Sequence, residues 1–503
     1  MGGIILIYTA VFGIVCLSWR LFPLLNKPHT GCDAYYFLLN RETFRKEKKI
    51  PIVLPDYYLL ENTEQWYPPG FSIFLSLIPD WLLYRFYWCV TPVLDTCIAL
   101  LIFFAGIAAG YEITMVFAAG CIYIFSPASI RETESLTSRQ LGALLLAITV
   151  SGAVLFLTSN SRLGLALFLV SGFFTLMTHK MSTQGLFAGL LLLTFVTGSM
   201  KPVLMLITLC TITVLFSRGY YLKILRSNID FLTFWKKNWP YLGSHQILDS
   251  PVYRREGHTF RGTYRGGTKK HIQNIQEYIF QNLYAGIALL IIWSRLRGVT
   301  DVPEYVFWPA VWTVSVLLFG LLTYIVPLLR GAGYMLQYGK MALPFGVWCS
   351  AYALTTTVFT LPALLITSII ILKYGVYEFF QLIYTGIPQN ITQWDLTRLK
   401  PLFDYLKACN NPIVLSIPNN YNDLLVYHCR IHTLWGSHGS PLDKIGDILP
   451  VFRYPVGEVA QKYGATHILV DTRYINPEIL DLKYKIDWKN EVLILFSTQK
   501  EEQ

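Results

Sequence analysis

Charged residues are scarce in this chain. Asp, Glu, Lys and Arg make up 14% of its 503 residues, whereas a soluble protein of this length is about one-quarter charged. Hydrophobic residues account for 53%, and the mean hydropathy is +0.43. Because this composition cannot cover a water-facing surface, it excludes both a soluble enzyme and a disordered chain. The composition instead indicates a membrane protein.

Several sequence motifs are also missing. The chain has no P-loop, no GxGxxG after a strand, no HExxH and no GxSxG, so ATP hydrolysis, nicotinamide chemistry and metalloproteolysis lack support. The nine cysteines include no CxxC pair. His428, His432 and His438 with Cys429 are spaced too irregularly for a zinc site. Whether Cys409 pairs with Cys429 in an oxidising compartment stays open.

Long apolar runs are abundant, and each could span a membrane. They lie at about 3–22, 86–110, 112–127, 140–158, 163–178, 182–199, 202–217, 279–294, 306–328, 341–356 and 358–377. We therefore expect a polytopic α-helical protein with about 11 transmembrane helices. The first run lacks a basic leader and a small-residue cleavage site, which predicts an uncleaved span. The run at 71–84 contains Pro79 and predicts a short or re-entrant helix.

The connections between these runs alternate between short and long. The long, charged and aromatic-rich ones are 23–85, 127–139, 179–181, 218–278, 329–340 and the tail from 378. The alternation places them all on one face. Basic residues on the short loops, including Arg162, Lys201 and Arg295, put the opposite face in the cytoplasm by the positive-inside rule. The basic 218–278 loop argues the other way, but we favour an extracytoplasmic long-loop face.

The tail has the composition of a soluble domain from about residue 390. A helix is expected at 393–408 and another at 456–463, with strands at 412–418, 467–471 and 491–497. This alternation predicts a small α/β domain. We expect two parts: 1–385 as a transmembrane module with large loops 23–85 and 218–278, and 386–503 as an extracytoplasmic α/β domain.

The chain carries a net charge of +10, from 41 basic and 31 acidic residues. Such an excess can attract nucleic acid, anionic lipid or a phosphorylated substrate. In a polytopic protein the lipid and phosphate interpretations come first, and we expect membrane lipids but no nucleic acid as partners.

The polar loops hold candidate functional residues. Asp33, near the membrane surface among aromatic residues, could be a general base or metal ligand. The alternative is an N-cap for a helix at 34–40. In the loop from Ser126 to Arg139, Arg131 and Arg139 suit a phosphate, and Glu132 and Glu134 suit a divalent ion or a sugar hydroxyl. The alternative is a solvated loop with mutual ion pairs.

Two further turns carry cations. His179 could bind a metal and Lys180 could neutralise a phosphate, although a lone histidine is more often a polar residue at the membrane interface. Arg330 and Lys340 flank a glycine-rich turn with Tyr334, which suits a lipid-linked phosphate at the bilayer edge. The alternative for these cations is snorkelling at helix ends.

Taken in this order, the features resemble the membrane glycosyltransferases of the C superfamily (GT-C). This superfamily includes the protein O-mannosyltransferases and the aminoarabinose transferase of lipid A, of family 39/83 type. The resemblance rests on Asp33 in the first loop, Tyr67-Pro68-Pro69 before a hydrophobic helix, the acidic loop from Ser126 to Arg139, and the element from Arg330 to Pro344. The tail segment from Tyr463 to Val470 looks like a strand of the C-terminal α/β domains of relatives.

The resemblance implies inverting transfer of a sugar from a polyprenyl-phosphate donor to a hydroxyl of a lipid, glycan or protein acceptor, at the extracytoplasmic face. Asp33 would be the base. The donor phosphate would contact Arg131, Arg139, Lys180, Arg330, Tyr334 and Lys340, and metal or sugar would contact Glu132, Glu134 and His179. Several relatives carry paired acids where this chain has Asp33-Ala34, so a divalent metal and a metal-independent mechanism both stay open.

This reading places the chain as a multi-pass protein in the plasma membrane of a prokaryote, or in the ER membrane if it is eukaryotic. A transporter or flippase of a lipid-linked or anionic molecule is the first alternative, with Asp95 as the clearest deep charge. A membrane polysaccharide polymerase or ligase is the second. The gathering of the other charges on one face favours the transferase.

Overall fold

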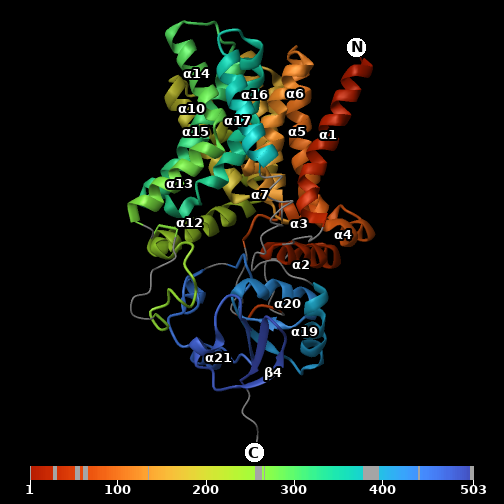
Figure 1. Cartoon of the computed structure of the whole chain (residues 1–503), viewed down its shortest axis with the longest axis vertical. Helices are drawn as coiled ribbons and strands as arrows, with labels where there is room; N and C mark the ends of the chain where they lie inside the picture. Colours follow the sequence, from red (N-terminus) through yellow and green to blue (C-terminus); the bar gives the residue numbers. More distant parts are fainter. Residues whose placement is uncertain are drawn as a thin grey trace, which may run out of the picture. The chain divides into compact units, whose positions relative to one another are not determined.

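The computed structural model describes residues 2–25, 31–50, 57–59, 66–133, 135–254, 263–264, 267–377, 396–439 and 442–498. The chain folds into two compact units. The first comprises Met1–Pro28, Asp80–Leu222 and Gln273–Pro388, and the second comprises His29–Pro79, Lys223–Ile272 and Gln389–Gln503. Figure 1 colours the chain from its N-terminus to its C-terminus and labels many of these elements.

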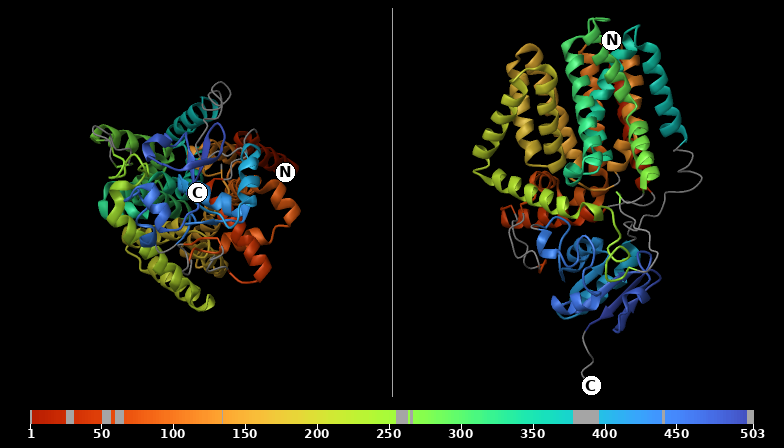
Figure 2. Two further views of the ribbon diagram at one scale, coloured as in Figure 1. Left: turned by 90° about the horizontal axis from the view of Figure 1, so that it is seen from below. Right: turned by 90° about the vertical axis from the view of Figure 1, so that its left-hand side faces the viewer.

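The first unit is a bundle of apolar helices. These are α1 (Gly2–Leu25), α4 (Asp80–Phe86), α5 (Val90–Ala108), α6 (Ile113–Phe125), α7 (Pro127–Thr133), α8 (Arg139–Ser159), α9 (Arg162–Leu176), α10 (Lys180–Thr197), α11 (Lys201–Phe216), α14 (Tyr284–Arg297), α15 (Glu304–Ile325), α16 (Leu336–Thr355) and α17 (Thr360–Ile370). Short η helices add Tyr87–Cys89, Pro327–Ala332 and the π-helical Ile371–Tyr377. In Figures 1 and 2 the long helices of this unit run side by side.

Each of the eleven long apolar runs expected to span the membrane coincides with a helix in this unit. The reason is that backbone groups without water must pair within their own segment, which a helix achieves. Five helices in the described part of the chain are long and apolar enough to cross a membrane, and up to seven if each of two bent pairs counts as one span. The expected number of about 11 spans stays a prediction.

Helices α8 and α9 show how closely the bundle packs. A side chain added at Gly152 would lie 2.6 Å from the backbone nitrogen of Phe168, and one added at Gly164 would lie 2.7 Å from that of Phe156. The two helix backbones therefore touch through glycines, as is common where helices associate in membranes.

The second unit combines helices with a mixed sheet. Its helices are α2 (Cys32–Glu47), α3 (Gly70–Ser76), α19 (Leu396–Ala408), α20 (Asn422–Cys429) and α21 (Val456–Lys462), and its strands are β1 (Ile413–Ile417), β2 (His432–Thr433), β3 (His467–Asp471), β4 (Lys485–Lys489) and β5 (Leu493–Ser497). Short η helices cover Trp239–Tyr241, Asn419–Tyr421, Leu442–Ile445 and Pro477–Leu480. Helices α12 (Tyr220–Asn238) and α13 (Gly267–Gln281) each contribute residues to both units.

The sheet has the strand order β2-β1-β3-β5-β4. Strand β1 pairs in parallel with β2 and β3, whereas β5 pairs antiparallel with β3 and β4. The three strands expected in the tail are confirmed as β1, β3 and β5. Strands β2 and β4 were not predicted from the sequence, because β2 has only two residues and β4 is rich in charged residues.

The long loops contribute to the same core as the tail. Ile247, from the 218–278 connection, is fully buried with Leu415 and Ile468 of the sheet. Leu39 of α2 and Tyr58 pack with Val426 of α20. The boundary expected at residues 385 and 386 stays a prediction, since the compact second unit also gathers parts of both loops.

The run at 71–84 forms two short helices, α3 and α4, in place of one. The break lies at residues 77–79. A proline at position 79 accounts for it, because the residue before proline is pushed out of the helical region.

Candidate functional site

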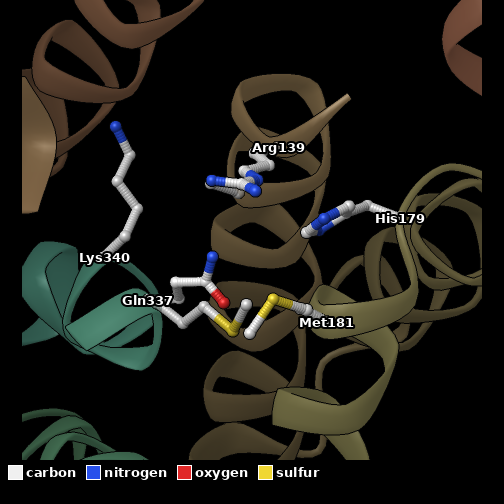
Figure 3. Close-up of a pocket in the computed structure, with 7 residues that line it drawn as sticks. Arg139, His179, Met181, Gln337 and Lys340 are labelled. Carbon is white, nitrogen blue, oxygen red and sulfur yellow. The ribbon is translucent and has the colours of Figure 1, made fainter. Parts of the chain in front are cut away.

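A pocket in the first unit collects three of the residues expected to bind substrate. Arg139 from the start of α8, His179 from the turn before α10 and Lys340 from α16 line it. Gln337, Met181 and the remaining lining residues Ala143 and Met341 complete the wall. Figure 3 shows the polar ends of Arg139, His179 and Gln337 directed toward the same space. Two cations and a histidine in one pocket favour an anionic ligand.

Lys340 is held by a buried carboxylate. Asp95 of α5 pairs with the ammonium of Lys340 and, at 2.7 Å, with the Nε of Arg20 of α1. The hydroxyls of Tyr123 and Ser129 donate to the same carboxylate at 2.8 and 2.9 Å. All five side chains are buried. The group carries two positive charges and one negative charge, and the Asp95 carboxylate is shared by both cations.

His179 also has a local structural role. It is the N-cap of α10, and its Nδ1 accepts from the backbone N–H of Ser182 at 3.4 Å. Any contact of this imidazole with a ligand would therefore use Nε2. From the sequence, His179 was expected as a possible ligand, and its role as the N-cap of α10 was not predicted.

Arg330, Tyr334 and Lys180 are not among the lining residues of this pocket. Arg330 lies in the segment between α15 and α16 and donates from Nε to the carbonyl of Tyr324 at 3.3 Å. The ring of Tyr334 meets that of Tyr324 edge-to-face at 6.2 Å. Lys180 is the first residue of α10 and is partly exposed.

Three expected contacts cannot be placed. Arg131 and Glu132 lie on α7, but their side chains are outside the described residues, as is the whole of Glu134. Among the described residues, no three His, Cys, Asp or Glu side chains gather as metal ligands would.

Asp33 lies in the second unit, in the first turn of α2. The N-cap of that helix is Gly31, at φ +68°, so the alternative expectation of Asp33 as the cap is wrong. A carboxylate within the first turn is favoured by the helix dipole. The Nε2 of His438 lies 3.8 Å from its Oδ2. Sequence spacing gave no sign of this pairing.

A second carboxyl lies close to this pair. Asp423 of α20 accepts from the hydroxyl of Tyr58 at 2.6 Å and from the backbone N–H of Ser437 at 3.1 Å. Burial raises the pKa of Asp423 to about 6, with the negative charge of Asp33 as a further cause, against the lowering effect of these hydrogen bonds.

His428→Phe is expected to make the protein less sensitive to acid. The imidazole stacks on Phe403 at 4.9 Å and meets Tyr35 edge-on at 5.1 Å. Burial, assisted by Lys407 and Arg430, lowers its pKa from 6.5 to about 4. Because the unfolded chain takes up the proton first, the stability contributed by this group is present above about pH 6.5 and is lost as the pH falls toward 4.

Phenylalanine keeps the packing of His428 and has no charge to acquire. Between pH 7 and 4.5 we expect wild type to lose on the order of 1 kcal/mol more stability than the variant. The thermal midpoint of the purified full chain, followed across that range, measures it. An equal acid shift in both proteins would contradict the prediction. Asp423 titrates alike in both, so the difference isolates His428.

Solved structures match this chain, although no protein-family model and no curated protein does. One is an oligosaccharyltransferase of Archaeoglobus fulgidus in the apo form, with a TM-score of 0.57 at 10% identity over 93% of this chain and 69% of that one. The archaeal oligosaccharyltransferase AglB from Archaeoglobus fulgidus, in complex with an inhibitory peptide and a dolichol-phosphate, matches with a TM-score of 0.55, at the same identity and coverage. ArnT from Cupriavidus metallidurans matches at 9% identity over 99% of this chain and 98% of that one, with a TM-score of 0.42 that is too low to carry an argument.

At this identity the likeness establishes the fold. It extends over nearly the whole chain, and it agrees with the run of apolar helices in the first unit and with the small sheet in the second. The chain therefore has the fold of this oligosaccharyltransferase, and the apolar helices of its first unit agree with the membrane protein that its composition indicates.

Proposed function

We propose that this protein is an integral membrane glycosyltransferase, which transfers a sugar from a polyprenyl-phosphate donor to an acceptor hydroxyl with inversion. One observation carries the proposal. Within a GT-C fold, the pocket is lined by Arg139, His179 and Lys340, each of which the sequence had singled out for substrate.

The charges around the pocket suit a phosphate. Arg139 supplies a planar guanidinium, which binds phosphate oxygens in pairs. Lys340 adds a second cation to the lining, and it shares the Asp95 carboxylate with Arg20. AglB has been solved with dolichol-phosphate, which supports a lipid phosphate as the ligand here. Lys180, Arg330 and Tyr334 would contact the donor outside this pocket.

In the proposed reaction, Asp33 takes the proton of the acceptor hydroxyl. The acceptor oxygen then bonds to the anomeric carbon while the bond from that carbon to the phosphate oxygen breaks. The lipid phosphate leaves with the electron pair, and Arg139 and Lys340 stabilise its charge. One base and one displacement give inversion.

The finer features of the proposal follow the sequence expectations. We propose about 11 membrane spans and catalysis at the extracytoplasmic face. We also propose a division into parts 1–385 and 386–503, and a lipid, glycan or protein as the acceptor. A divalent metal is left open, because the side chains of Glu132 and Glu134 lie outside the described residues.

Arg139→Ala is expected to raise the KM for the donor about ten- to hundredfold, which corresponds to losing a charge-assisted hydrogen bond of about 1.5–3 kcal/mol. Arg162→Ala is a matched control, since Arg162 is likewise the first residue of its helix but is exposed. Steady-state kinetics over donor concentration measure both. An unchanged donor KM in Arg139→Ala would remove this residue from the phosphate site. The variant Arg330→Ala tests separately whether the guanidinium beside Tyr324 also binds the donor.

A donor screen tests the function itself. Purified protein would be incubated with radiolabelled polyprenyl-phosphate sugars and with lipid, glycan and peptide acceptors. Transfer of label with inverted anomeric configuration supports the proposal. Movement of labelled lipid across a vesicle bilayer without transfer would favour a flippase, and processive chain growth would favour a polymerase.

A further inference from the structure

One partner of Asp33 comes from a distant part of the chain. His438 follows strand β2, 405 residues after Asp33, and its Nε2 lies 3.8 Å from the Asp33 carboxylate. The two side chains are 13% and 24% exposed. At this distance the two groups form an ion pair when the imidazole is protonated.

Aromatic rings hold the imidazole of His438 in place. Tyr67 stacks on it at 4.2 Å, Tyr36 meets it edge-on at 4.7 Å, and Phe37 lies at 5.3 Å. Tyr36 and Phe37 belong to α2, as does Asp33. One helix therefore carries the carboxylate and two of the rings that orient its partner.

Hydrogen bonds from α20 fix the backbone that carries His438. The amide of Asn422 donates to the carbonyl of Trp435 at 2.7 Å, and the carboxylate of Asp423 accepts from the N–H of Ser437 at 3.1 Å. Both are buried polar side chains. Two anchors within three residues leave the turn before His438 little freedom.

Gly436 completes the arrangement. A Cβ at this position would lie 2.8 Å from the ring of Tyr58 and 3.1 Å from the Asp423 carboxylate. Only glycine lets the turn approach Tyr58 this closely. The hydroxyl of Tyr58 in turn donates to Asp423. The turn at residues 435–437 is therefore held in one position against Tyr58 and α20.

We propose that His438 is a positioning residue for Asp33, so that the C-terminal segment completes the catalytic apparatus of the transferase. The inference rests on the proposed function, in which Asp33 is the base. The imidazole would keep the carboxylate in one orientation and ionised, ready to accept the acceptor proton. His438 itself would not touch the reacting atoms.

Kinetics of three variants test the proposal. His438→Phe keeps an aromatic ring without a donor, and we expect its kcat to fall on the order of ten- to hundredfold with little change in donor KM, because the base is misplaced. His438→Gln restores a donor and should recover part of the loss. The matched control is His467→Gln. In the wild-type protein the Nε2 of His467 lies 3.7 Å from the Asp487 carboxylate, and the two side chains are 9% and 19% exposed. The kcat of this variant should equal that of wild type. Wild-type kcat in His438→Phe would overturn the proposal.

A second measurement does not depend on activity. In full-length protein with labelled histidines, the imidazole signal that disappears in His438→Gln is that of His438. The titratable groups facing it are Asp33, Tyr36 and Tyr67, with Asp423 behind the turn. Replacing Asp33 with Asn should shift the titration of His438 to lower pH, since the imidazolium loses its opposite charge.

The two readouts separate the two hypotheses. A titration of His438 that is the same in wild type and Asp33→Asn overturns the pairing, whatever the protein catalyses. A wild-type protein inactive with every donor would refute the proposed function. In that case a shifted titration would still establish the pair, but the role in transfer would fall with the function.

Discussion

Asp33→Asn is expected to reduce the rate of sugar transfer by a factor on the order of 10² to 10⁴, the usual contribution of a general base. Asparagine has nearly the shape of aspartate, so the start of α2 and the rings around it should stay packed. It cannot accept the acceptor proton, however. Because the loss concerns the chemical step, kcat should fall while the donor KM changes little.

Two further variants sharpen the test of Asp33. Asp404→Asn removes an exposed carboxylate on α19 and should leave kcat unchanged, which controls for the loss of one negative charge. Asp33→Glu keeps a base but moves it by about one carbon-carbon bond, and should give an intermediate rate. Turnover in Asp33→Asn equal to wild type would remove this residue from the base role. All three should unfold at similar temperatures.

The helical part of the fold could be predicted from the sequence because lipid leaves the backbone so few choices. An apolar run such as 140–158 has to be helical, and α8 covers it. The tail was predictable for another reason. Strand β3 is buried along its whole length, and its apolar residues begin shortly after Gly464, which at φ +66° follows the end of helix α21.

Pairings between distant residues could not be predicted in this way. Asp95 stood out as a deep charge, but nothing in its neighbourhood identifies Arg20, 75 positions earlier, or Lys340, 245 positions later. His438 was set aside because the tail histidines show no metal spacing. Local periodicity reports which face of an element is buried, whereas such contacts depend on how the elements pack.

The group around Asp95 also governs stability. Asp95→Asn would leave the cations of Arg20 and Lys340 buried without their shared carboxylate. Breaking a buried ion pair from one side costs about 3–5 kcal/mol, because the remaining charge has lost its solvent and its partner. We therefore expect a large drop in the thermal midpoint in detergent, and low yield from membranes.

Comparing variants separates the charge from the packing in this group. Arg20→Met leaves Asp95 paired one-to-one with Lys340, so it should be less destabilising than Asp95→Asn; the reverse order would contradict this account.

The triple variant Arg20→Met, Asp95→Leu and Lys340→Met removes all three charges, and apolar replacement of a buried ionic group is often neutral for stability. It should regain most of the thermal midpoint. Since Lys340 also lines the pocket, the triple variant should nevertheless bind the lipid-phosphate donor poorly, whereas donor affinity equal to wild type would assign Lys340 to the fold alone.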